Sequence, residues 1–516
     1  MSNVPLSPHP PHLFERVRIV TARPAGYPHS AAFQEYARGL LAAFAALGAQ
    51  VDAVDNEFLA GDGVNFVFGA HLLAPGTVLP SNTVIVNLEQ MRAGWPARIP
   101  HYLEMLRHHP VLDYSPSNVE RIRELTGNAH VHVLTPGYVP QLTCIPAAAE
   151  QDVDVLFYGF LNERRYKILD ALRAAGLVVQ HLKGVYGDER DQWIARSKLV
   201  LNVHYYDDKI HEVIRTSWLL ANRKAVVSEC EPDTEIADDL REAVVAVPYD
   251  DLVQTCVALV RDDARRHEAG QRGFEIFARR DQAAILAALL PKLSVPVPRR
   301  VNLGSGKSYD PERLNIDIDP KWQPDILGDL AHPAGLKQIF FSPRYGLTRL
   351  EAGQFDEIEA TDVLEHVPAL TRLMTHCLEL LREGGAMRVV VPYDLSHGAW
   401  QDPTHVRAFN ERSWWYYTQW HWYLGWIEAR FDLSTLIMTL SPFGRELRSR
   451  GIADEEIFRT PRAVDAMEAI LVKRMLTESE REAAFAMHSG AQRGATANVA
   501  KPALSQSLPG RFEQQR

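Results

Sequence analysis

The feature that most constrains the fold of this chain is the alternation of short apolar runs with segments of helical periodicity. The run at 17–22 (VRIVTA) is followed by apolar residues spaced three and four apart between 33 and 47, and further apolar runs follow at 64–68 and 83–88. Such spacing predicts buried strands connected by amphipathic helices. Strands that alternate with helices form parallel sheets with helices on both faces, so we expect an α/β fold.

The same pattern recurs along the chain, whose 516 residues are too many for one ordinary core. A second series of strands begins at 153–158 (VDVLFY), and a third begins at 300–303 after the proline-rich stretch 289–298. Beyond 475 the sequence is polar and has no sustained apolar periodicity. We expect a disordered start (1–13), two α/β units (14–140 and 141–290), a linker (291–298), a third α/β unit (299–475) and a disordered tail (476–516).

Composition argues against several classes of protein. Acidic residues exceed basic ones by 65 to 55 and no long basic run occurs, whereas nucleic-acid binding needs clustered lysine and arginine. The four cysteines lack the paired spacing of a zinc site or a disulfide framework. The first residues, MSNVPLSPHPPHLFERV, contain no apolar run preceded by positive charge, so we expect no secretory signal. No run of about 18 to 20 apolar residues that could span a membrane occurs in the sequence. We expect a cytoplasmic protein with no metal, no nucleic-acid partner and no transmembrane segment.

The segment 301–308 (VNLGSGKS) poses a choice between a phosphate and a methyl donor. Its end, Gly306-Lys307-Ser308, has the letters that close a P-loop, but a P-loop needs a glycine five positions before Gly306, where Val301 stands. The segment instead predicts a strand that runs into a glycine turn. Binding of NAD is a weaker alternative, because Tyr309 stands where G-x-G-x-x-G requires its third glycine.

Acidic residues follow the next three predicted strands. The second strand, 314–319 (LNIDID), ends in acidic residues that include Asp317, and a carboxylate there can accept hydrogen bonds from both ribose hydroxyls of a nucleoside. Asp329 follows the third strand, where an adenine amino group can donate to it, and Asp362 follows the fourth. Each alone is equally well explained as a turn residue. Together, and in this order, they predict an adenosyl ligand.

These motifs are similar in order and spacing to those of class I S-adenosylmethionine-dependent methyltransferases over 299–475: VNLGSGKS, LNIDID, ILGD, FDEIEATDVLEHVP and LLREGGAMRVVVP. The resemblance implies S-adenosylmethionine as cofactor, and it places Glu365-His366 on the acceptor side. It implies these donor contacts: the methionine part against Gly304 and Gly306, the ribose on Asp317, the adenine near Asp329, and Asp362 close to the pocket.

A polar loop at 393–410 (YDLSHGAWQDPTHVRAFN) supplies further acceptor-side candidates. Methyl transfer to a hydroxyl needs a base, or a polar group that orients the hydroxyl, and the histidine candidates are His366, His397 and His405. Asp402 and Arg407 can bind a sugar or, as the alternative, tie the loop to itself. The DPTHVRAFN part resembles a segment of bacterial methyltransferases linked to surface polysaccharides.

The segment 413–426 (SWWYYTQWHWYLGW) contains five tryptophans and three tyrosines. Aromatic rings of this density pack a core or a lid, stack on sugars, or anchor a protein at a membrane surface. We favour core or lid packing over contact with a sugar or lipid-linked acceptor. Membrane anchoring ranks below both, because no basic cluster flanks the segment.

The two consecutive units over 14–290 resemble GT-B glycosyltransferases, in which two such lobes face each other across a cleft. The resemblance rests on DYSPSNVERIRELTG, VHVLTPGYVP, DVLFYGFLNERRYKIL and HEVIRTSWLLANRKAVVSE. It implies a nucleotide-sugar donor as co-substrate, held by the second lobe in the region of the last of these motifs.

Charged residues of the second lobe suit such a donor. Its diphosphate leaves with two negative charges, which backbone amides and cations can stabilise without a metal. Arg164 and Arg165 directly follow the first strand of the lobe and can meet the diphosphate. Glu212 and Arg215 lie on one side of a helix, and the resemblance implies that Glu212 binds the sugar or ribose. The alternatives are a solvated turn and an ordinary ion pair.

We therefore expect a bifunctional enzyme, a glycosyltransferase fused to a methyltransferase that O-methylates a sugar hydroxyl during assembly of a bacterial surface polysaccharide. Its acceptor would be a glycan or a lipid-linked saccharide. The main alternative is a methyltransferase with a non-catalytic, GT-B-like carbohydrate-binding module. A third option is a methyltransferase for a protein or small molecule with an unrelated N-terminal half.

Overall fold

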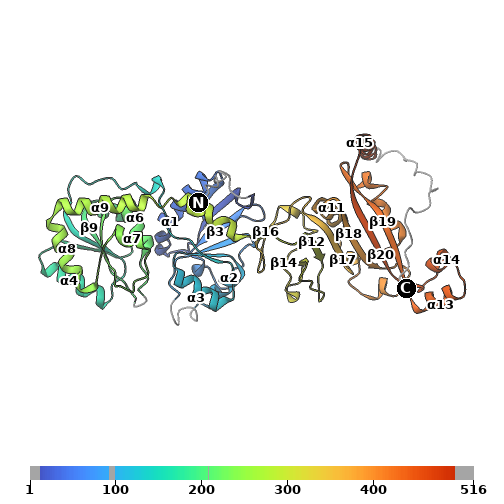
Figure 1. The fold of residues 1–516 in the computed structure, drawn as a ribbon, viewed down its shortest axis with the longest axis horizontal. Coiled ribbons are helices and arrows are strands. Elements are labelled where there is room, and N and C mark those ends of the chain that lie inside the picture. The colour runs from blue at the N-terminus through green and yellow to red at the C-terminus, as the bar shows by residue number, and fades with distance from the viewer. Residues whose placement is uncertain (1–11, 92–98, 207–208, 494–516) are drawn as a thin grey trace, which may run out of the picture. The chain divides into compact units, whose positions relative to one another are not determined.

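The computed structural model describes residues 12–91, 99–206 and 209–493 (Figure 1). It divides into two compact units, Met1–Val295 and Pro296–Arg516. Unit 1 contains two parallel sheets and unit 2 one mostly parallel sheet, so the expected α/β architecture with three Rossmann-like sheets is confirmed. In the part of the chain that the structure describes, no helix has both the length and the apolar character needed to cross a membrane.

The first lobe of unit 1 is built on a parallel sheet with the strand order β2-β1-β3-β4-β5-β6. Every residue of β3 and β4 is buried, because helices cover both faces of these inner strands. The strands are β1 (Arg16–Thr21), β2 (Gln50–Asp55), β3 (Val64–Phe68), β4 (Thr83–Asn87), β5 (Val111–Asp113) and β6 (Val131–Val133), and the helices are α1 (Gln34–Ala46), α2 (Pro100–His108) and α3 (Pro116–Thr126).

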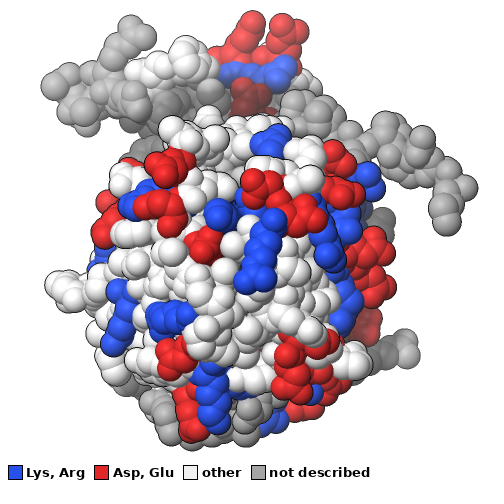
Figure 2. All heavy atoms as spheres, turned by 90° about the vertical axis from the view of Figure 1, so that its left-hand side faces the viewer, with Lys and Arg blue, Asp and Glu red and all other residues white. Residues whose placement is uncertain are grey.

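The second lobe is built on a parallel sheet with the order β11-β10-β9-β7-β8. Figure 2 shows basic and acidic side chains interspersed on its outer face, without a large patch of one sign. Its strands are β7 (Val153–Tyr158), β8 (Val179–Leu182), β9 (Ser197–Asn202), β10 (Ala225–Glu229) and β11 (Val245–Val247). Its helices are α4 (Glu163–Ala174), α5 (Gly187–Arg196), α6 (Val213–Ala221), α7 (Asp238–Ala243), α8 (Leu252–Arg261), α9 (Asp263–Ala278) and α10 (Gln282–Leu289).

The last helix of unit 1 returns to the first lobe. Helix α10 packs on α1, and the Gln282 side chain accepts a hydrogen bond of 2.7 Å from the Gly137 N–H. Leu293, inside the expected linker (291–298), and Leu290, just before it, are fully buried. The expected division therefore needs two corrections. Residues 282–289 follow the second lobe in sequence but pack on the first, and the linker begins only after residue 293.

Unit 2 has one mixed sheet with the order β14-β13-β12-β17-β18-β20-β19. It is parallel from β14 to β18, and β20 pairs antiparallel with both β18 and β19. Its strands are β12 (Arg300–Leu303), β13 (Leu314–Asp317), β14 (Ile326–Leu327), β17 (Phe355–Thr361), β18 (Leu381–Pro392), β19 (Ala429–Leu440) and β20 (Val464–Met475). A separate hairpin joins β15 (Ile339–Ser342) and β16 (Gly346–Arg349), and the helices are α11 (Leu370–Leu380), α12 (Gly398–Gln401), α13 (Pro442–Ser449) and α14 (Asp454–Arg459).

The prediction of a disordered tail is wrong for its first part, because helix α15 spans Glu478–Arg493. The Thr477 N–H donates to the Glu480 carboxylate, and the Glu480 N–H donates back to the Thr477 hydroxyl, which together cap the start of the helix. The His488 ring also contacts the Trp422 carbonyl at 2.9 Å. Capping and tertiary contact thus order a segment that lacks apolar periodicity. Residues 1–11 and 494–516 lie outside the described residues.

Candidate functional site

A cavity of about 460 Å³ lies between the two lobes of unit 1. The first lobe contributes residues of α1 and of the loop after β4, and the second contributes residues of α5, α6 and the loops after β7 and β9. Its charged and tyrosine lining residues are Glu35, Glu89, Tyr114, Tyr158, Arg165, Tyr186, Arg190, Tyr205, Tyr206, Glu212 and Arg215.

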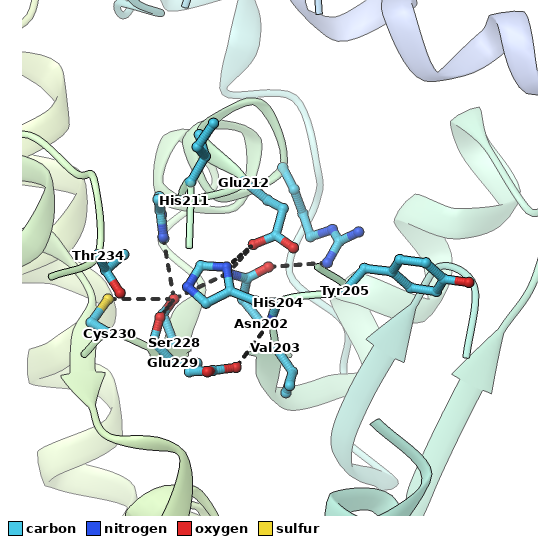
Figure 3. Close-up of polar contacts among 12 residues, drawn as sticks. Asn202, Val203, His204, Tyr205, His211, Glu212, Ser228, Glu229, Cys230 and Thr234 are labelled. Atoms are coloured by element: carbon cyan, nitrogen blue, oxygen red, sulfur yellow. Dashed lines mark hydrogen bonds and ion pairs between the residues drawn. The ribbon is translucent and has the colours of Figure 1, made fainter. Parts of the chain in front are cut away.

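Three of the four predicted donor-side residues meet in this cavity around one carboxylate. Glu212 precedes α6, and its carboxylate accepts hydrogen bonds from Arg165 Nη2 at 3.1 Å and Asn202 Nδ2 at 3.0 Å. Arg215 Nη1 in turn donates to Asn202 Oδ1 at 3.0 Å. His204 Nδ1 lies 3.2 Å from Glu212, and Figure 3 shows the His204 ring beside this carboxylate. The site is thus a compact network of charged groups.

The charges of this network hold Glu212 ionised. Burial raises the pKa of Glu212, but the hydrogen bond and charge of His204, together with Arg215 and Arg165, outweigh burial and lower that pKa to about 2. Burial and the neighbouring Arg215 lower the pKa of Arg165 to about 10. Glu212 and Arg165 therefore both carry full charge at neutral pH. An anion entering the cavity meets the guanidinium groups of Arg165, Arg190 and Arg215.

The fourth predicted residue, Arg164, has a different place. Among the described residues, those lining the cavity include Arg165 but not Arg164. The Arg164 guanidinium makes a two-pronged ion pair with Glu229 and lies 4.0 Å from the centre of the Tyr249 ring. Glu229 is 1 % exposed and also accepts from the His204 N–H (Figure 3). Consecutive residues of a helix point about 100° apart, so Arg164 and Arg165 cannot both face the cavity.

Sequence reasoning missed the contacts that join the two lobes beside the cavity. Arg190 Nη2 of α5 lies 2.8 Å from the Glu35 carboxylate of α1, and both side chains are nearly buried. The Ser115 hydroxyl donates to Glu235 at 2.5 Å. These partners are more than a hundred residues apart and belong to no local motif, so no signal in the sequence pairs them.

In unit 2 the predicted donor-binding residues gather at the carboxyl ends of neighbouring parallel strands, where α/β sheets bind ligands. The Gly306 N–H donates to Asp317 at 2.8 Å, and the Asp319 N–H donates to the other Asp317 oxygen at 2.9 Å. Asp317 is 9 % exposed, and a carboxylate has about four acceptor positions, so it can still accept from a ligand. Asp329 is exposed and accepts from the Ala331 N–H at 2.7 Å.

Backbone strain marks the end of β17. Asp362 has φ +54, a left-handed conformation that only a few per cent of non-glycine residues adopt. Gly304, at the end of β12, has φ +64, and a Cβ atom there would lie 2.4 Å from Val363 Cγ2. Strained residues of this kind cluster at functional sites. The glycine turn and the Asp362 loop therefore touch where the methyl donor is expected.

We expect Gly304→Ala to weaken S-adenosylhomocysteine binding and to lower the free energy of unfolding of the protein. Gly353→Ala is a matched control, because Gly353 has φ +71 but no atom within 4 Å of the added methyl group. Both variants place alanine in a left-handed conformation, but only in Gly304→Ala does the added methyl group collide with Val363. The collision should lower the free energy of unfolding by about 1–3 kcal/mol more than in the control. Denaturant unfolding and calorimetry measure the difference, and equal behaviour of the two variants would contradict the close approach.

The predicted acceptor-side residues separate into two groups. Glu365, His366 and His405 form a cluster in which His405 Nε2 lies 4.0 Å from Glu365 and the two imidazole rings are 4.6 Å apart. Burial, helped by the charge of Asp362, raises the pKa of Glu365 to about 7, although His405 acts against this rise.

The other three predicted residues lie around this cluster. His397 is exposed on the loop before α12. Asp402 accepts from the N–H and the hydroxyl of Thr404, and Arg407 donates to the carbonyls of Val367 and Pro368. Asp402 thus ties its own loop together, and Arg407 holds the loop against the segment that follows Glu365. Both contacts match the structural alternative weighed from the sequence.

Part of the aromatic segment belongs to the core of unit 2. Trp414, Tyr417 and Trp426 are buried, and Trp414 stacks on Phe409 with ring centres 5.7 Å apart. Tyr416 and Tyr423 are exposed, with their ring centres 5.8 Å apart. Core packing, favoured from the sequence, accounts for the buried rings.

Comparison with known proteins finds distantly similar sequences. No family model matches the chain. It is 26% identical over 184 residues and 30% identical over 162 residues to two uncharacterized proteins of Acanthamoeba polyphaga mimivirus. These matches cover 34% and 31% of this chain, and 58% and 18% of the relatives. The chain therefore spans less than two thirds of the length of the relatives it matches.

Solved structures with detectable similarity include two kinds of transferase. Anabaena Alr3699/HepE in complex with UDP and glucose has a TM-score of 0.37 at 11% identity, over 54% of this chain and 98% of that one. WaaG, a glycosyltransferase involved in lipopolysaccharide biosynthesis, has a TM-score of 0.36 at 12% identity, over 53% and 98%. A SAM dependent methyltransferase from Archaeoglobus fulgidus has a TM-score of 0.22 at 15% identity, over 37% and 91%.

Proposed function

We propose that the chain is a bifunctional cytoplasmic enzyme. Unit 1 transfers a sugar from a nucleotide-sugar donor, and unit 2 transfers a methyl group from S-adenosylmethionine to a hydroxyl of a glycan or lipid-linked saccharide. Both steps belong to the assembly of a bacterial surface polysaccharide. The joining of the two folds in one chain is the reason for linking the two steps.

The observation that carries the proposal for unit 1 is the charged network in the cavity between the lobes. Arg165 and Arg215 present guanidinium groups to the cavity, and ionised Glu212 offers acceptor oxygens for sugar or ribose hydroxyls. When the glycosidic bond to the donor breaks, negative charge develops on the departing diphosphate. Cations fixed beforehand in a partly desolvated cavity stabilise that charge without a reorganisation cost.

For unit 2 the supporting observation is the contact of the glycine turn with the Asp362 loop above Asp317. The missing Cβ of Gly304 lets Val363 pack against the glycine turn, and Asp317 is held in place by two backbone N–H groups. S-adenosylmethionine supplies an electrophilic methyl group when bound. The residues of this chain would hold its ribose at Asp317 and orient the accepting hydroxyl beside the Glu365 cluster.

The second candidate is a methyltransferase whose unit 1 binds a glycan without reacting it. It is favoured by the mutual pairing of Arg165, Glu212 and Asn202, since groups that already bond one another can serve as a fixed recognition surface. Under this alternative the cavity binds saccharide but no nucleotide.

Calorimetric titration of the intact protein with S-adenosylhomocysteine, and then with UDP, GDP and dTDP, separates the two candidates. We expect the adenosyl ligand and one nucleotide to bind independently. Arg215→Ala should weaken nucleotide binding at least about 10-fold, because it removes a cation that pairs with the diphosphate. Binding of the adenosyl ligand should be unaffected. Binding of the adenosyl ligand alone would favour the glycan-binding alternative, and binding of neither would overturn both.

A further inference from the structure

Three metal-binding side chains converge on the acceptor side of unit 2. A carboxylate oxygen of Glu365 and one ring nitrogen each of His366 and His405 lie within 4.8 Å of one another. His405 is 39 positions beyond His366 in the sequence, so no local spacing announces the group. The Val406 N–H donates to the Glu365 carbonyl at 2.8 Å, which fixes the loop bearing His405 against the segment bearing the other two donors.

Hydrogen bonds set both imidazoles in the form that binds metal. His405 Nδ1 lies 3.0 Å from the Ala399 carbonyl, which can only accept, so in the neutral ring Nδ1 carries the proton and the lone pair is on Nε2. His366 Nδ1 lies 2.9 Å from the Thr404 hydroxyl, which donates its own hydrogen to Asp402 at 2.7 Å. The Thr404 oxygen therefore accepts from His366 Nδ1, and His366 Nε2 also keeps its lone pair. Outer partners of this kind are typical of histidine metal ligands.

The burial of the Glu365 carboxylate is a second, independent indication that this cluster binds a cation. Glu365 is 1 % exposed, and within the described residues neither of its oxygens has a hydrogen-bond partner. A buried carboxylate without partners costs several kcal/mol, so such groups are paired, hydrogen-bonded or bound to metal. Here the nearest candidates for partners are two imidazoles whose open nitrogens are acceptors. A cation shared by all three groups satisfies every one of them.

We propose that Glu365, His366 and His405 bind one divalent transition-metal ion. Two imidazoles and one carboxylate are the donor set of catalytic zinc sites and suit first-row metals in general, and such sites leave positions open for a substrate. Metal–ligand bonds of about 2.0–2.2 Å at tetrahedral angles put donors about 3.3 Å apart, so the three atoms need to draw together by about 1 Å. The side chains of Glu365 and His405 are nearly buried and His366 is only partly buried, so the ion is accessible from the side of His366.

This inference rests on the proposed methyl transfer for its chemistry and narrows the acceptor class. A metal with open positions binds the accepting hydroxyl, lowers its pKa, and can bind a neighbouring oxygen as well. The hydroxyl proton passes to solvent. The oxygen then forms a bond with the methyl carbon while the carbon–sulfur bond breaks, and its electron pair stays on sulfur as a neutral thioether. The acceptor is therefore a saccharide in which the methylated hydroxyl has an adjacent oxygen.

Titration of untagged, metal-free protein with Co²⁺, followed by visible absorption, tests the site without any need for activity. We expect one tightly bound equivalent that Zn²⁺ displaces. His405→Ala and Glu365→Gln should abolish that equivalent, whereas Glu379→Gln, a charge-matched change at an exposed position of α11, should keep it. Retention of the equivalent in His405→Ala would overturn the proposal, as would its absence from the parent protein.

A milder variant guards against a loss that merely reflects misfolding. Thr404 is exposed and touches His366 only through its hydroxyl, so Thr404→Val should weaken Co²⁺ about 10-fold while leaving the fold intact. Unchanged affinity in Thr404→Val would contradict the assigned role of His366. S-adenosylhomocysteine binding is measured on the same samples. Co²⁺ binding without S-adenosylhomocysteine binding would contradict only the methyltransferase proposal. S-adenosylhomocysteine binding without Co²⁺ binding would contradict only the metal site.

Discussion

Replacing Asp317 with alanine is expected to weaken S-adenosylhomocysteine binding by about 100-fold. The carboxylate is the predicted acceptor for the ribose hydroxyls, and a hydrogen bond to a charged group contributes about 1.5–3 kcal/mol. The same change frees the N–H groups of Gly306 and Asp319, which Asp317 holds at 2.8 Å and 2.9 Å. Loss of affinity therefore has two sources, the missing acceptor and a less ordered glycine turn.

Two comparisons separate these sources. Asp317→Asn keeps one acceptor oxygen and should lose less affinity than Asp317→Ala. Asp319→Ala removes a carboxylate that is ion-paired with Lys321, and it should bind the ligand as the parent protein does. If Asp317→Ala bound S-adenosylhomocysteine as tightly as the parent protein does, Asp317 would not be part of the donor site.

The second large effect is expected at Glu212, which ties the charged network of unit 1 together. The pKa of Glu212 is about 2, below the ordinary value near 4.5, so its ionised form stabilises the folded state. A difference of this size corresponds to about 3 kcal/mol. That contribution is complete above the ordinary pKa and is lost as pH falls towards 2. Glu212→Gln should therefore lower the free energy of unfolding by about 3 kcal/mol at pH 7, and by clearly less at pH 3.

Denaturant unfolding at the two pH values measures this difference, with Glu163→Gln as the control for loss of one carboxylate. Glu163 pairs with Lys167 on the exposed face of α4, and we expect no measurable change there. Nucleotide binding should be lost in Glu212→Gln only. If the loss of unfolding free energy in Glu212→Gln were as large at pH 3 as at pH 7, the ionised state of Glu212 in this network would be contradicted.

Much of the fold was predictable because its signals are local. The apolar runs that predicted strands at 64–68 and 83–88 match β3 and β4, and the glycine turn at 304–306 ends β12 as expected. Asp317 also ends its strand as expected. Such features depend on a residue and its near neighbours, so they can be recognised from spacing alone.

Helix α15 is an element that local sequence signals did not predict. Its sequence has no apolar stripe, and its order comes from the capping pair of Thr477 and Glu480 and from contact with Trp422. Arg164 and Arg165 illustrate the same limit. The sequence suggested both for the diphosphate, but the buried Glu229 binds Arg164, and only Arg165 faces the cavity.

The sequence by itself determined the α/β units, the glycine turn and the acidic residues at the strand ends of unit 2. Only the tertiary structure decided the Glu35–Arg190 pair between the lobes and the convergence of Glu365 with His405. The physical reason is that strand and helix signals repeat along the chain. The meeting of two distant side chains depends instead on which loops the sheet order brings to the same edge.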